Sequence, residues 1–100
     1  MNIDKWVQML NNRDYSSAYN LLDETFRNNT FGSQEKFEKY MKENYSLQYS
    51  ITYNEYKEEN DISIMSITLK DILGKNETTK DLKIIMQLNN NYDFVMSFEI

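Results

Sequence analysis

The sequence predicts an α+β domain in which three N-terminal helices come first and a four-stranded antiparallel sheet follows. One change of pattern and the nature of the turns carry this prediction. Apolar residues recur at helical spacing up to about residue 45, and from Leu47 onward they alternate with polar residues at the period of a strand. Short polar turns between the strands favour an antiparallel meander. We expect a single domain over residues 1–100, with helices in about 3–45 and strands in about 47–100.

Each predicted helix begins at a residue that can accept a hydrogen bond from the first turn. Asn2, Asp14 and Ser33 are the expected N-caps of the three helices. Each cap precedes an apolar stripe with spacings of three and four residues. The stripes are Ile3, Trp6, Val7 and Leu10, then Tyr15, Ala18, Tyr19, Leu22 and Phe26, then Phe37, Tyr40 and Met41.

Two side chains are expected to stabilise the turns between the helices. Asp23 is predicted either to pair with Arg27, one helical turn further on, or to hold the turn itself. Phe31 lies just before the third helix and is expected to pack on Phe37 in the manner of a hydrophobic staple. Both interpretations are structural and assign no ligand.

Four apolar alternations predict the strands, and Asn-rich or Gly-containing segments separate them. A change of parity between Ile64 and Met65 predicts a β-bulge in the second strand. Turns are expected at 58–60 and 89–91, and a longer loop at 74–76. The apolar positions of the four strands are Leu47, Tyr49, Ile51 and Tyr53, then Ile62, Ile64, Met65, Ile67 and Leu69, then Leu82, Ile84, Met86 and Leu88, then Phe94, Met96 and Phe98.

Composition disfavours several classes of function. The net charge is −5 and neither half of the chain has a basic excess, which disfavours binding to nucleic acid or to an anionic membrane surface. The chain has no Cys and no His, so thiol nucleophiles, the usual zinc sites and imidazole catalysis are excluded. We therefore expect no cofactor and no metal. We also expect no membrane insertion by this segment, because it contains no long apolar run.

Residues 14–44, DYSSAYNLLDETFRNNTFGSQEKFEKYMKEN, resemble the helical half of nuclear transport factor two-like (cystatin-like cone) domains in uncharacterised Firmicutes proteins. Residues 93–100, DFVMSFEI, look like the last strand of those domains. The resemblance implies three helices packed on a curved sheet. It also implies a parent protein with an upstream membrane anchor, which favours the extracytoplasmic face of a bacterial membrane, with the cytoplasm as the alternative. The matching residues are Asp14, Tyr15, Ala18, Tyr19, Leu21, Leu22, Asp23, Phe37 and Tyr40.

Enzymes of the resembled fold place a carboxylate or His in the pocket between helices and sheet. The strand acids of this chain are Glu55, Asp71, Asp93 and Glu99, and their parity or their place near turns predicts that none faces inward as a base. We therefore expect a non-catalytic domain. An enzyme of the same fold remains the alternative.

Two candidate sites follow from strand parity. Tyr49 and Tyr53, together with Tyr19, are candidates for lining a small apolar-ligand pocket, although core packing is the favoured interpretation of all three. Ile85 and Val95 have the parity opposite to the main apolar row of their strands. An apolar residue on the second face of a sheet indicates a cover, which is a homodimer mate, another protein or a further segment of the parent chain, or else isolated surface aliphatics. The favoured function is a protein-binding or scaffolding domain, and a ligand-binding pocket protein is the alternative.

Overall fold

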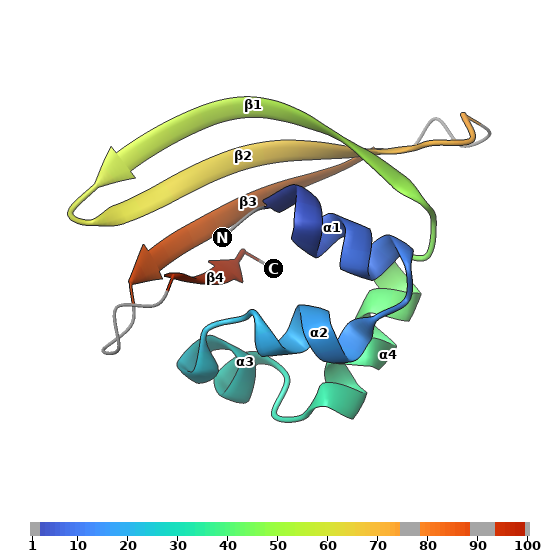
Figure 1. Cartoon of the computed structure of the whole chain (residues 1–100), viewed down its shortest axis with the longest axis horizontal. Helices are drawn as coiled ribbons and strands as arrows, with labels where there is room; N and C mark the ends of the chain where they lie inside the picture. The colour runs from blue at the N-terminus through green and yellow to red at the C-terminus, as the bar shows by residue number, and fades with distance from the viewer. Residues whose placement is uncertain (1–2, 75–78, 89–93, 100) are drawn as a thin grey trace. The chain divides into compact units, whose positions relative to one another are not determined.

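The computed structural model describes residues 3–74, 79–88 and 94–99, which form four helices followed by four strands (Figure 1). The chain divides into two compact units, a helical unit that ends at Leu47 and a sheet unit that begins at Gln48. The α+β class and the order of helices before strands are confirmed. The boundary lies where the apolar pattern changes from helical to alternating. The grouping of residues 1–100 into a single domain stays a prediction.

The helical unit contains α1 (Ile3–Asn11), α2 (Tyr15–Asn20), α3 (Glu24–Thr30) and α4 (Gln34–Asn44). The second predicted helix is thus two helices. The chain turns after α2, and Asp23 begins α3 by accepting the Phe26 N–H on its Oδ2 atom at 2.9 Å. Of the two roles expected for Asp23, it holds the turn. The Arg27 guanidinium instead lies over the Tyr19 ring, 5.3 Å from its centroid.

The other expected caps are present where the structure describes them. Asp14 Oδ1 accepts the Ser17 N–H at 3.2 Å, and Ser33 Oγ accepts the Lys36 N–H at 3.3 Å. Each satisfies a backbone donor that the first helical turn leaves without a partner. Asn2, the cap expected for α1, lies outside the described residues.

Aromatic side chains fill the interior of the helical unit. The fully buried Trp6 donates its indole N–H to the Ala18 carbonyl at 3.1 Å, which joins α1 to α2. Phe31 packs edge-on against Phe37 with ring centroids 5.1 Å apart, so the expected staple-like contact is confirmed. Phe31 also contacts the Tyr40 ring at 5.4 Å. Burial raises the pKa of the Tyr40 phenol above its ordinary value of 10.0.

The sheet unit is a curved antiparallel meander of β1 (Tyr49–Glu59), β2 (Ile62–Asp71), β3 (Thr79–Leu88) and β4 (Phe94–Phe98), in that spatial order (Figure 1). The first turn is a two-residue hairpin at Asn60 and Asp61, whose φ angles are +48° and +67°. Two positive φ angles are typical of a type I′ turn, and Asn and Asp adopt them more readily than most residues. The loop residues 75–78 and the turn expected at 89–91 lie outside the described residues.

The predicted β-bulge between Ile64 and Met65 is wrong. β2 pairs continuously with β3 at these positions, and the two residues simply project from opposite faces. The register shift lies in β1, between Tyr53 and Glu55. Asn54 is the additional residue there, and its side-chain amide donates to Thr68 Oγ1 at 2.8 Å. This hydrogen bond ties the bulge to β2.

The two faces of the sheet differ in exposure. The buried face carries the core residues of all four strands, and the opposite side, which we call the open face, carries polar and charged residues around a few aliphatic ones. The core residues of the buried face are Tyr49, Ile67, Leu69, Leu82, Ile84, Met96 and Phe98. The aliphatic residues of the open face are Ile62, Ile64, Ile85 and Val95.

Candidate functional site on the open face of the sheet

Aliphatic side chains occupy the centre of the open face. Ile64 and Ile85 are directly opposed partners on β2 and β3, and Val95 of β4 lies opposite Gln87 in the next row on this face. All three aliphatic residues are partly exposed. The register therefore confirms that Ile85 and Val95 project away from the main apolar row. Their role in binding a partner stays a prediction. Strand parity alone did not assign Ile64 to this face, and the register shows it opposite Ile85.

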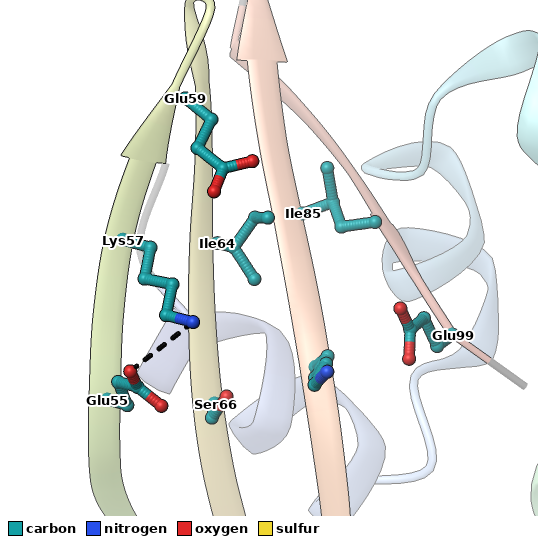
Figure 2. Close-up of a pocket in the computed structure, with 8 residues that line it drawn as sticks. Glu55, Lys57, Glu59, Ile64, Ser66, Ile85 and Glu99 are labelled. Carbon is teal, nitrogen blue, oxygen red and sulfur yellow. Dashed lines mark ion pairs between the residues drawn. The ribbon is translucent and has the colours of Figure 1, made fainter.

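Charged side chains surround this centre and form a shallow hollow of about 150 Å³ (Figure 2). On β1, the Lys57 ammonium lies 3.5 Å from Glu55 Oε1. Both side chains are more than half exposed, so this ion pair contributes little to stability. The residues that line the hollow are Glu55, Lys57, Glu59, Ile64, Ser66, Lys83, Ile85 and Glu99.

Carboxylates border the aliphatic centre on both sides. Glu55 and Glu59 project from β1, one of the two outer strands of the sheet. Glu99 lies on the other side, directly after β4, where its backbone N–H donates to the Lys83 carbonyl at 3.2 Å and extends the strand pairing. Figure 2 shows Glu59 on the side of Ile64 and Glu99 on the side of Ile85. The site is thus an aliphatic strip with carboxylates on both sides, and on the β1 side Lys57 lies between Glu55 and Glu59.

The bulge in β1 determines which side chains border the strip on the β1 side. Because Asn54 is additional, Glu55 pairs with Ser66 and Lys57 pairs with Ile64, which places both on the open face. Tyr56 pairs with Met65 and projects from the opposite face. One sequence signal could have revealed this shift: the apolar residues of β1 are two apart from Tyr49 through Ile51 to Tyr53, and the next one, Tyr56, follows after three.

A polar cluster adjoins the hollow. The Thr68 hydroxyl accepts from Asn54 and donates to Asp81 Oδ1, each at 2.8 Å. The cluster links three neighbouring strands at the level of the bulge, and Asp81 is exposed. These hydrogen bonds account for the three side chains as a support for the bulged strand rather than as reacting groups.

The three tyrosines expected to line a ligand pocket have different environments. Tyr19 is buried in the helical unit, whereas Tyr49 and Tyr53 project from the same face of β1 in the sheet unit. Tyr49 is 4% exposed and Tyr53 is 45% exposed. Only one of the two strand tyrosines is therefore enclosed, and the pocket stays a prediction.

One strand acid departs from expectation. Asp71 lies on the buried face and is 6% exposed, so the interpretation that no strand acid faces inward is wrong for this residue. Its Oδ1 atom accepts the Leu73 N–H at 3.0 Å, and its backbone carbonyl accepts the Gly74 N–H at 3.1 Å. Asp71 thus organises the turn that follows β2. Glu99 projects from the open face as expected, Glu55 is in mid-strand rather than near a strand end, and Asp93 lies outside the described residues.

A second hollow, of about 410 Å³, lies in the helical unit. Arg13 has a φ of +59° and donates from its guanidinium to the Ser46 carbonyl at 2.6 Å. Lys42 pairs with Glu38 at 3.0 Å and lies 5.8 Å from the centroid of the Tyr15 ring. The cationic groups of this hollow thus already have partners within the helical unit.

Within the part of the chain that the structure describes, no group of three or more acidic side chains is arranged to hold a metal ion. None of the helices described there is both long enough and apolar enough to cross a membrane. Comparisons of the chain with protein-family models, with curated proteins and with solved structures found no match.

Proposed function

We propose that the chain is a non-catalytic protein-binding or scaffolding domain and that it binds through the open face of the sheet. The observation that carries the proposal is the aliphatic strip of Ile64, Ile85 and Val95 on the face opposite the core. A sheet that needs only one covered face alternates cleanly between apolar and polar residues. Here β2 and β3 depart from that alternation at directly opposed positions, which favours a contact surface over scattered aliphatics.

The chemistry of the surface supports binding rather than catalysis. An aliphatic centre with a charged margin is the usual anatomy of a protein interface, in which apolar side chains lose water and the margin sets orientation. The acidic groups at the margin are exposed, whereas a general base is typically tuned by burial or by neighbouring charge. The proposed relationship to cone-shaped domains, and with it an extracytoplasmic location, is supported by the sequence resemblance of residues 14–44 and 93–100.

Photo-crosslinking tests the proposal. A benzophenone amino acid replaces Ile85 in one variant and the exposed Glu43 of α4 in a matched control, and both variants are irradiated in the cells that naturally express the protein. We expect protein adducts, either with a second copy or with another protein, from position 85 and much weaker adducts from position 43. Equal yields from both positions, or no adduct from position 85, would contradict a binding role for the open face.

A further inference from the structure

We infer that the occupant of the open face is an amphipathic helix whose apolar stripe is flanked by basic residues. The inference rests on the proposed function and specifies the chemistry of the partner. Two features of the face support it, namely its width and the carboxylates on both sides of the aliphatic strip. A third argument is that the same charges would repel one another in a symmetric dimer.

The width of the face fits a single helix. Neighbouring strands lie about 4.8 Å apart, so the distance from β1 to β4 across three spacings is roughly 14 Å. A helix with its side chains is about 10–12 Å wide. A helix that lies along β2 and β3 therefore covers Ile64 and Ile85 with its central stripe, and its two flanks lie above the outer strands.

The flanks of such a helix would meet carboxylates. Glu55 and Glu59 lie on the β1 side and Glu99 lies on the β4 side. The lysines that line the hollow are Lys57, which pairs with Glu55, and Lys83, so three acidic groups outnumber two basic ones. Lys or Arg on both flanks of the helix would complement this margin, and acidic flanks would be repelled by it.

The same charges disfavour a second copy of the chain as the occupant. Two open faces that stack the Ile64–Ile85 pair on the same pair of a second copy are related by a two-fold axis that runs either along the strands or across them through this row. An axis along the strands places β1 over β4 of the second copy and opposes Glu55 to Glu99. An axis across the strands through the row of Lys57 opposes Lys57 to itself and Glu55 to Glu59. Both arrangements bring like charges together.

A pair of designed peptides tests the inference. Each is an 18-residue helix with leucines at spacings of three and four, and the two flanks carry lysines in one peptide and glutamates in the other. Binding to the full chain is measured by fluorescence anisotropy at low and at physiological salt. We expect the lysine peptide to bind at least about tenfold more tightly than the glutamate peptide, and the difference to shrink as salt screens the charges.

Two sets of variants locate the binding site. Replacement of Glu55, Glu59 and Glu99 by Gln is expected to weaken binding of the lysine peptide by about tenfold. Ile64→Lys should abolish the binding, and far-UV circular dichroism checks that this variant is folded. The matched control replaces Glu24, Glu35 and Glu43 by Gln, which removes the same charge from exposed positions of the helical unit. This control is expected to change the affinity by less than about twofold.

The outcomes separate the inference from the proposed function. If both peptides bind equally and Ile64→Lys abolishes both, the open face binds proteins but the basic partner is wrong. If neither peptide binds and sedimentation shows a dimer that Ile85→Lys dissociates, the occupant is a second copy and the inference is overturned. If the lysine peptide binds Ile64→Lys as tightly as the unchanged chain, or the two sets of Gln replacements weaken it equally, the attraction is non-specific and the inference is also overturned.

Discussion

Adjacent isoleucines on β3 provide a matched test of the two faces of the sheet. Ile84 is 0% exposed on the buried face, whereas Ile85 is partly exposed on the open face. Replacing either by Ala removes three carbon atoms. At about 0.8 kcal/mol for each buried carbon, Ile84→Ala loses roughly 2.4 kcal/mol of transfer free energy, and the cavity left behind raises the total to about 3 kcal/mol. Ile85→Ala leaves no enclosed cavity and should cost about 1 kcal/mol.

Urea denaturation followed by circular dichroism measures both free energies of unfolding. The expected difference of about 2 kcal/mol corresponds to roughly a 30-fold difference in the unfolding equilibrium constant and to about 8–16 °C in Tm. Unchanged m-values show that the comparison is valid. Equal costs for the two substitutions would refute the reasoning, because Ile85 would then belong to the core rather than to a surface available for a partner.

Three further predictions concern capping, the hairpin turn and pH. Asp14→Ala removes the cap of α2 and should cost about 0.5–2 kcal/mol of unfolding free energy in the same urea assay, whereas Asp14→Ser should restore most of it. A cost near zero would mean that the cap is not used in solution. Asp61→Gly relieves a φ of +67° and should raise stability by about 0.4–1 kcal/mol, with a fall in Tm as the contrary result. The pKa of Tyr40 is higher in the folded chain than in the unfolded chain, so the unfolded chain loses this proton at lower pH. Its contribution to stability is therefore complete below the unfolded pKa and is lost as pH rises through the folded pKa. Tyr40→Phe should make the alkaline decline in unfolding free energy shallower, and an unchanged decline would count against burial of the phenol.

The helix starts could be predicted because capping is local. Asp14 and Ser33 each act on a backbone N–H three residues away, so the sequence contains both partners of the interaction. The break between α2 and α3 was harder to predict, because apolar residues continue at helical spacing through Leu22 and no Gly or Pro interrupts them. The signal was Asp23, whose capping side chain competes with helix continuation.

The full length of β1 and its bulge depend on pairing between strands. Residues 55–59 are rich in charge and have weak strand propensity, yet they pair with β2 along the whole hairpin. Register is a property of two strands together, so alternation within β2 alone placed the bulge at the wrong position. The candidate surface was predicted in part for the same reason. Ile85 and Val95 were found from parity, but Glu55 and Lys57 required the register shift that brings them to the open face.

The most direct test of the open face is chemical-shift mapping of the ¹⁵N-labelled chain during titration with the lysine-flanked helical peptide. Binding at this face predicts that the amide signals of Ile64, Ser66, Lys83 and Ile85 shift together and saturate, and that signals of the helical unit move little. Shifts concentrated in the helical unit, or shifts on the open face that persist unchanged in the Ile64→Lys variant, would contradict the assignment of this face as the protein-binding surface.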